Sequence, residues 1–387
     1  MRSASTRVAV IVETSRGHGR QIIAGVSQYA VEHPAWSLRL EPRNIDDRPP
    51  CWLRTWTGDG IIVRCDSPSM AKAVLAADVP VVDVRGGAPE AELPLVQVDN
   101  RAIPEAAFVH FKERGFRHFA WCDLFRLQRP WVTIRRTRFL ELVRESGGVH
   151  YCFQSRRTLN RGTPVSTELM AELRDWLKGL PRPVGILACD DEQAHIVLDA
   201  ALSLGMKVPA DAAVLGIDND EVFCNASSPS LSSVDVNAFT VGYEAAAMLA
   251  QLMEGRRVSA PRTVPPRGVI ARTSTDIVAV DSAEIATAVR LIRERSCQGL
   301  TADNVAEAIV VSRSTLDRLL KTTIGLTATA AIMQARLDRV KADLADTELP
   351  IKTLARRAGF RSVHHLSNLF HKREGVTPGQ YRRTMRR

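Results

Sequence analysis

The sequence predicts a large two-lobed α/β domain followed by an all-α domain with two helix-turn-helix motifs. Three observations lead to this prediction. Short β-branched apolar runs alternate with amphipathic helical stretches through residues 1–280. Two helix-turn-helix patterns then follow one another between residues 301 and 375. The basic excess of the whole chain lies in this same C-terminal region.

The α/β alternation begins at residues 8–12 (VAVIV), an apolar run of strand type. A helical stretch follows at 18–32, with Ile22, Val26 and Tyr29 on one face. Similar apolar runs recur further along the chain at 61–63, 79–84, 119–122, 184–188 and 214–217. Such short continuous runs predict parallel strands covered by helices on both faces. A chain of 387 residues is long enough for two or three domains, and this amount of alternation favours two sheets.

Polar residues directly after these runs are the first candidates for a ligand site, because ligands of open α/β sheets bind beyond the carboxyl ends of the strands. They are Glu13, Arg16, Arg64, Asp66, Asp190, Asp191, Asp218, Asn219 and Asp220. Such groups suit a sugar, whose hydroxyls both donate and accept hydrogen bonds. A sugar also packs its C–H faces on aromatic rings, for which Trp131, Trp121 and Phe223 are candidates. Each Asp after a strand has a structural alternative as a helix N-cap.

Other site classes find little support in the sequence. It contains no GxSxG elbow, GxGxxG fingerprint or P-loop. Its seven cysteines form no CxxC pair or Cys/His cluster at zinc spacing. The first apolar run breaks at Glu13, too soon for a membrane span or a signal peptide. We therefore expect a cytoplasmic protein without catalytic residues, metal, cofactor or membrane contact.

The charge of the chain is divided unevenly. Residues 261–280 are rich in Pro and then in Ser and Thr, so we place the domain boundary between 280 and 281. From Ile285 onward there are 19 Lys and Arg against 9 Asp and Glu, a net charge of +10, which leaves −1 for the remainder. A concentrated positive field on a small helical unit is typical of a protein that binds the phosphates of double-stranded DNA. A merely solvated basic surface is the alternative.

The first helix-turn-helix motif is expected at about 301–325. Thr301 and Ser312 can cap its two helices, and Gly325 can end the second. In such motifs the second helix enters the major groove. The outward-facing positions of that helix, and hence the predicted DNA contacts, are Arg313, Ser314, Asp317, Arg318 and Lys321.

The second motif is expected at about 350–375, with its turn at Gly359 and Ser362 as the cap of the recognition helix. The predicted DNA contacts are Val363, His364, Ser367 and Asn368, with Lys372 and Arg373 placed at phosphates. His364 and the adjacent His365 diverge by about 100° on a helix, so they cannot share one metal ion.

The stretch 351–383 (IKTLARRAGFRSVHHLSNLFHKREGVTPGQYRR) resembles the signature of AraC/XylS-type transcription regulators. The resemblance implies a double-stranded DNA operator, a homodimer and, for an activator, contact with RNA polymerase. One departure lies in the first motif, where Val310 occupies the turn position usually held by Gly. A β-branched residue resists positive φ. We therefore expect that turn to be remodelled and its recognition helix tilted.

Residues 1–280 resemble the effector domain of LacI/GalR-type repressors and type I periplasmic sugar-binding proteins, through GRQIIAGV at 19–26, GIDND at 216–220 and RTSTD at 272–276. The resemblance implies a periplasmic-binding-protein-like fold, with one lobe at about 7–117 and 237–262 and the other at about 118–236 and 263–272. It maps effector contacts onto Arg135, Asp190 and Asp218. Glu13, Arg16, Asp66 and Trp131 are further candidates by position.

The two resemblances together imply a sugar-responsive transcription regulator, with activation as the expected mode. The expected effector is a small monosaccharide, with xylose as first choice, which closes the lobes and changes the geometry of a dimer on its operator. The alternative is a sugar-processing or sugar-transport protein with an accessory helical domain. Which sugar binds, and whether the protein activates or represses, stay open at this point.

Overall fold

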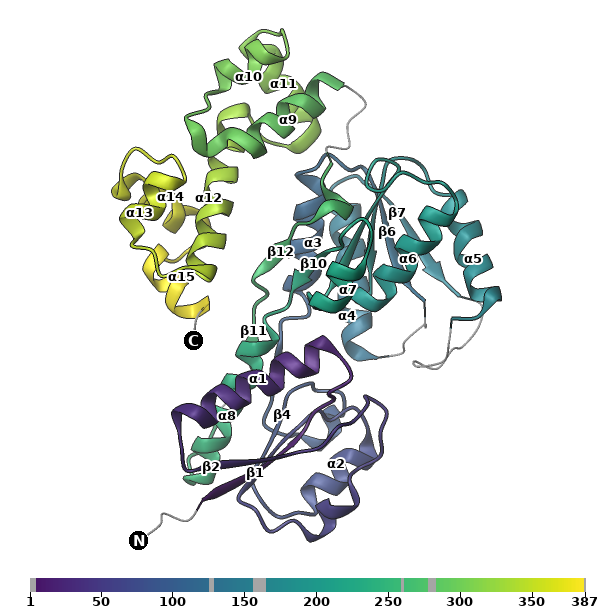
Figure 1. The fold of residues 1–387 in the computed structure, drawn as a ribbon, viewed down its shortest axis with the longest axis vertical. Helices are drawn as coiled ribbons and strands as arrows, with labels where there is room; N and C mark the ends of the chain where they lie inside the picture. Colours follow the sequence, from purple (N-terminus) through teal and green to yellow (C-terminus); the bar gives the residue numbers. More distant parts are fainter. Residues whose placement is uncertain (1–4, 125–128, 156–164, 259–260, 278–282, 386–387) are drawn as a thin grey trace. The chain divides into compact units, whose positions relative to one another are not determined.

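The structure is a computed structural model that describes residues 5–124, 129–155, 165–258, 261–277 and 283–385. The chain divides into two compact units (Figure 1). The first consists of Met1–Phe108 with His118–Asp276, and the second of Val109–Arg117 with Ile277–Arg387. The boundary predicted between 280 and 281 lies outside the described residues.

The first unit contains an N-terminal parallel sheet with the strand order β2-β1-β3-β4. The strands are β1 (Thr6–Ile11), β2 (Trp36–Leu40), β3 (Gly60–Val63) and β4 (Val81–Asp83). A parallel pair of β5 (Val96–Val98) and β11 (Arg262–Val264) joins the edge of β4 through a bridge between Asp83 and Leu95. Segments far apart in sequence therefore build one lobe.

Helices cover both faces of this sheet, as its continuous apolar strands predicted. On one face α2 (Pro68–Leu75) packs Met70 and Val74 against Ala9 and Ile61. Helices α1 (Gly17–Glu32) and α8 (Ala238–Met253) lie side by side on the sheet (Figure 1). They approach closely because Gly25 and Gly242 have no side chain: a Cβ would lie 2.0 Å from the Phe239 carbonyl and 1.9 Å from the Ile22 carbonyl, respectively.

A second sheet has the order β12-β10-β9-β8-β6-β7 and is parallel except at β12, which runs antiparallel to β10. Its strands are β6 (His118–Asp123), β7 (Val149–Gln154), β8 (Val184–Ala188), β9 (Ala212–Ile217), β10 (Ser232–Asp235) and β12 (Gly268–Ile270). The accompanying helices are α3 (Ala102–Lys112), α4 (Pro130–Glu145), α5 (Thr167–Lys178), α6 (Asp191–Ser203) and α7 (Glu221–Ala226). Leucines of α5 and alanines of α6 pack with the strands in one core. The predicted pair of parallel sheets is confirmed.

The second unit contains the helices that follow residue 282. They are α9 (Ala283–Arg295), α10 (Ala302–Ala308), α11 (Arg313–Ile324), α12 (Ala328–Asp346), α13 (Ile351–Arg357), α14 (Val363–Glu374) and α15 (Pro378–Met385). Two hydrophobic cores stabilise them. The N-terminal half of α12 packs with α9, α10 and α11, and its C-terminal half packs with α13, α14 and α15. Helix α12 therefore connects two helix-turn-helix motifs, and the predicted all-α domain is confirmed.

The turn of the first motif corrects one prediction. Val310 adopts a φ of 57°, in the same left-handed region as the 76° of Gly359 in the second motif. The hydrogen bonds also correspond: Val311 N–H donates to Ala306 at 3.0 Å, and Phe360 N–H donates to Ala355 at 2.9 Å. The expectation of a remodelled turn is wrong. The Val310 side chain is 91% exposed, so it meets no neighbour that would force the backbone elsewhere.

None of the helices in the described ranges is long and apolar enough to cross a membrane.

Candidate functional site

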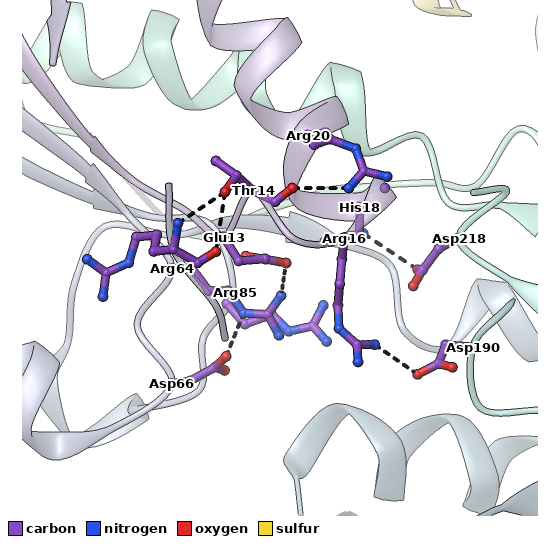
Figure 2. A network of polar contacts seen from close by, with 12 residues as sticks. Glu13, Thr14, Arg16, His18, Arg20, Arg64, Asp66, Arg85, Asp190 and Asp218 are labelled. Atoms are coloured by element: carbon purple, nitrogen blue, oxygen red, sulfur yellow. Dashed lines mark hydrogen bonds and ion pairs between the residues drawn. The ribbon is translucent and has the colours of Figure 1, made fainter. Parts of the chain in front are cut away.

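The carboxyl ends of strands from both sheets of the first unit bring polar side chains together (Figure 2). We call this set the polar network; its members come from the ends of β1, β3, β4, β8 and β9, from the start of α1 and from the first two turns of α4. They are Glu13, Arg16, His18, Arg64, Asp66, Arg85, Trp131, Arg135, Asp190 and Asp218. All seven residues predicted for the effector site belong to it.

Arg64 holds two carboxylates of the N-terminal sheet. Its guanidinium is buried, donates from Nη1 to Glu13 Oε1, and donates from Nε to Asp66 Oδ2 at 2.5 Å. Burial disfavours the charge of Arg64, but these two carboxylates hold its pKa above the ordinary value. Burial likewise acts against the charge of Asp66, whose pKa is nevertheless lowered by Arg64 and then Arg85. Arg64 and Asp66 are therefore both charged at neutral pH.

Three contacts join the start of α1 to residues that follow β8 and β9 of the second sheet. Arg16, at the start of α1, lies 3.4 Å from Asp190 Oδ2 and 2.5 Å from Glu192 Oε2. His18 Nδ1 lies 3.5 Å from Asp218 Oδ1. Figure 2 shows Arg16 directed toward Asp190 and His18 directed toward Asp218. Asp190 also caps α6 by accepting the Gln193 N–H at 2.9 Å, so the N-cap alternative holds for Asp190 alongside its contact with Arg16.

Asp218 is held in a strained backbone. Its φ is 106° and that of Asn219 is 51°, both uncommon for residues other than glycine. Burial opposes the charge of Asp218, but its close contact with His18 and the charges of Arg135 and Arg85 lower its pKa. Burial lowers the pKa of His18, which favours the neutral imidazole. Backbone strain that the surrounding structure maintains is common at ligand sites.

Trp131 and Arg135 come from α4, which begins with Pro130 at its first turn. Arg135 is 1% exposed and donates from Nε to Asn100 Oδ1 at 2.9 Å. The Trp131 ring is buried. The Arg85 guanidinium lies 4.1 Å from the ring centroid, and the Arg135 guanidinium lies 4.9 Å from it. The ring is therefore already in contact with two cations.

The other two aromatic candidates lie outside the polar network. Trp121 is buried in the core, where it packs against Phe139. Phe223 lies on α7 beside His195.

Arg85, His18 and Asn100 were not predicted as effector contacts from the sequence. Arg85 follows an apolar run directly, so the rule that found Arg64 and Asp66 also applies to it. His18 lies in the first turn of α1, and Asn100 lies in the segment between β5 and α3. These two depend on tertiary contacts and have no comparable signal.

Several buried polar atoms of this network have no hydrogen-bond partner among the described residues. Glu13 Oε2 and Asp66 Oδ1 are acceptors, whereas Arg85 Nε and Arg135 Nη2 are donors. A buried group without a partner costs about 1–3 kcal/mol. Unpaired donors and acceptors in one place can both be satisfied by hydroxyl groups, which act in both ways. The arrangement suits a small polyhydroxylated ligand.

In the second unit, the predicted DNA contacts on α11 differ in exposure: three are exposed, and two are bonded to neighbouring residues. Ser314, Arg318 and Lys321 are exposed. Arg313 instead donates to Asp303 at 2.9 Å and to Thr329 at 2.7 Å, and Asp317 accepts the Ala328 N–H at 2.8 Å. These two residues thus stabilise the start of α12 and its neighbours. Ser312 caps α11 by accepting the Thr315 N–H at 3.1 Å, as predicted.

Helix α14 presents the corresponding surface of the second motif. Val363, His364, Asn368, Lys372 and Arg373 are exposed, and Ser367 is half-buried. His364 Nε2 and Asn368 Nδ2 lie 3.0 Å apart on successive turns. Ser362 caps the helix by accepting the His365 N–H at 3.1 Å, which confirms that prediction.

Comparison with known families covers most of the chain. Residues 7–100 match the XylR N-terminal domain, residues 108–275 a periplasmic binding protein-like domain, and residues 305–384 a helix-turn-helix domain. The xylose operon regulatory protein of Escherichia coli (strain K12) is 31% identical over 97% of this chain and 96% of the relative. The protein of the same name from Haemophilus influenzae is 29% identical over 97% and 98%, respectively.

A solved structure described as the xylose-binding transcription activator XylR is 30% identical, covers 97% of both chains and has a TM-score of 0.63. The match extends over both the α/β domain and the helical domain, which decides between the two functions considered from the sequence. The chain belongs to the family of the xylose operon regulatory proteins and is a transcription regulator with a helix-turn-helix DNA-binding domain.

Proposed function

We propose that this regulator activates a sugar-catabolic operon and that its effector is a monosaccharide, with xylose as first choice. The observation that carries the proposal is the set of buried donors and acceptors without partners in the polar network. The choice of xylose rests on the relatives, which are xylose operon regulators. The sugar would contact Arg135, Asp190 and Asp218, together with Glu13, Arg16, Asp66 and Trp131.

The mechanism follows from the position of the network. Its residues come from both lobes of the first unit, so a ligand that satisfies them favours the closed arrangement of the lobes. A ligand shifts a conformational equilibrium only by its difference in affinity for the two states. We infer that closure changes the geometry of a homodimer on double-stranded DNA, and that the closed form supports contact with RNA polymerase.

Calorimetric titration with a panel of pentoses and hexoses tests the site. Arg135→Ala should abolish sugar binding, because this guanidinium is buried and has one nitrogen without a partner. A matched control is Arg138→Ala on the same helix, whose side chain forms ion pairs with Glu105 and Glu141. Unchanged sugar binding by Arg135→Ala would remove this site assignment.

A gel-shift assay on the DNA upstream of the protein's own coding region tests regulation. Addition of the bound sugar should change the affinity or mobility of the complex, and Arg135→Ala should lose that response. A wild-type complex that is identical with and without every sugar of the panel would contradict the proposed function.

A further inference from the structure

Arg85 lies at the centre of the polar network, although its role is not explained by contacts within the protein. It follows β4 and is 6% exposed. The charged groups that act on it include Arg64, Asp66 and Asp218. Figure 2 shows it in the same group of side chains as Arg64 and Arg16. Its guanidinium rests on the Trp131 ring at 4.1 Å.

The other buried arginines of the network each have a side-chain partner: Arg64 binds Glu13 and Asp66, and Arg135 binds Asn100. Within the described part of the chain, no atom accepts a hydrogen bond from the Arg85 side chain, and its buried Nε has no partner. Contact with an aromatic ring offsets only part of the cost of burying a guanidinium. Burial and then the charge of Arg64 lower the pKa of Arg85 to about 9.

A partner for Arg85 must therefore supply acceptor oxygens. A guanidinium has five donors and no acceptor, and two of its N–H groups form a planar fork that fits two neighbouring oxygens. Hydroxyls on adjacent carbons of a sugar ring provide such a pair. The same hydroxyls can donate to Glu13 Oε2 and Asp66 Oδ1, which are the unpartnered acceptors of the network.

We propose that Arg85 is an effector-contacting residue that selects for the hydroxyl pattern of the sugar, by donating to one or two adjacent ring hydroxyls while its plane stays on Trp131. This inference rests on the proposed sugar-binding function. It assigns Arg85 a direct role in specificity, beyond a structural role in supporting the Trp131 ring.

The test combines substitutions at Arg85 with deoxy analogues of the sugar that the wild-type chain binds. Calorimetry measures the affinity of wild type and Arg85→Gln for the parent sugar and for each mono-deoxy analogue. In the wild type, loss of the contacted hydroxyl should weaken binding by about 10- to 100-fold, as for hydrogen bonds to charged groups. In Arg85→Gln the parent sugar should bind weaker by a similar factor, and removal of that one hydroxyl should cause little further loss.

If Arg85 contacts the sugar directly, the losses from Arg85→Gln and from removal of the contacted hydroxyl should not add, and this should hold for only one or two hydroxyls. If Arg85→Gln weakens all analogues by the same factor, Arg85 only supports the site and the proposal is overturned. Unchanged affinity in Arg85→Gln overturns it as well, while leaving the proposed function intact. Failure of the wild type to bind any sugar of the panel overturns the proposed function and this inference together.

Two further variants keep the test interpretable. Arg85→Lys retains the charge but lacks the planar fork, so it should lose the same hydroxyl preference even if Arg85→Gln unfolds. Arg138→Gln, a substitution on the surface of α4, should show the wild-type pattern of losses with every analogue. Retained hydroxyl preference in a folded Arg85→Lys would contradict the predicted fork contact.

Discussion

The turns of the two helix-turn-helix motifs have the same backbone conformation but differ in what surrounds them. Val310 and Gly359 both adopt positive φ, at 57° and 76°. A Cβ added to Gly359 would lie 3.0 Å from the Cys297 carbonyl and 3.4 Å from Arg336 Nε. The Val310 side chain, in contrast, extends into solvent. The same turn is therefore packed in the second motif and open in the first.

This difference shows that two separate causes can favour glycine at such a turn. One is the left-handed backbone, which costs a residue with a side chain on the order of 1–3 kcal/mol. The other is lack of space, which applies only where the turn meets a neighbour. Only the first cause, the left-handed backbone, applies at the turn of the first motif, so a valine is tolerated there at a moderate cost. Both causes apply at the turn of the second motif, which explains why Gly359 occupies it.

Gly359→Val should have the largest effect. Backbone strain and the close contact with Cys297 together should lower the stability of the second motif by about 3 kcal/mol. Hydrogen exchange of amides in α13 and α14 measures this local loss. Amides of α10 and α11 serve as the internal control and should keep their protection. Equal loss in both motifs would mean that they unfold as one unit, and no loss would contradict the packing argument.

Substitution of an exposed residue on each recognition helix compares how the motifs contact DNA. Arg318→Ala should weaken operator binding by about 1–3 kcal/mol and relax the preference at one base pair. Asn368→Ala should do the same at a base pair in the other part of the site. Binding to a set of operator variants measures both. If the loss for Arg318→Ala is uniform across the variants, this residue contacts only phosphate.

Val310→Gly should act in the opposite direction from Gly359→Val. It removes the left-handed strain, although the flexibility of glycine in the unfolded chain offsets part of the gain. We expect the first motif to gain about 1 kcal/mol, measured as slower hydrogen exchange in α10 and α11. Val310→Ala is the control and should give a smaller change, because it keeps a Cβ. Destabilisation by Val310→Gly would show that the valine side chain has an unrecognised role.

The smallest effect is expected for the two exposed lysines, Lys321 in the first motif and Lys372 in the second. Lys321→Gln and Lys372→Gln should each reduce the salt dependence of binding by about one unit of slope, with little change in base preference. Titrations at several salt concentrations measure the slope. A change for only one of the two would show that the corresponding motif carries the phosphate contacts at that end of its helix.

The sequence predicted much of the fold because its signals are local. Continuous apolar runs marked β1, β3, β4, β6, β8 and β9, whereas strands without such a run, among them β2 and β7, were not predicted. Ser312 and Ser362 marked the starts of the recognition helices. The position after strands predicted that Glu13 lies near Asp66 at the edge of one sheet and Asp190 near Asp218 at the edge of the other, because parallel strands end at the same edge of a sheet. The contacts that join the two pairs into one network are tertiary. Val310 adopts a positive φ without remodelling of the turn, because its side chain is exposed, and this exposure is not visible in the sequence.

By itself, the sequence determined two parallel sheets, two helix-turn-helix motifs and which polar residues directly follow the apolar strands, since periodicity, capping and position after a strand are properties of neighbouring residues. Only the tertiary structure decided which polar atoms lack partners, that Arg85 and Arg135 both contact Trp131, and that space is limited at Gly359 but open at Val310. These depend on segments far apart in the chain, whose proximity is set by packing rather than by local pattern.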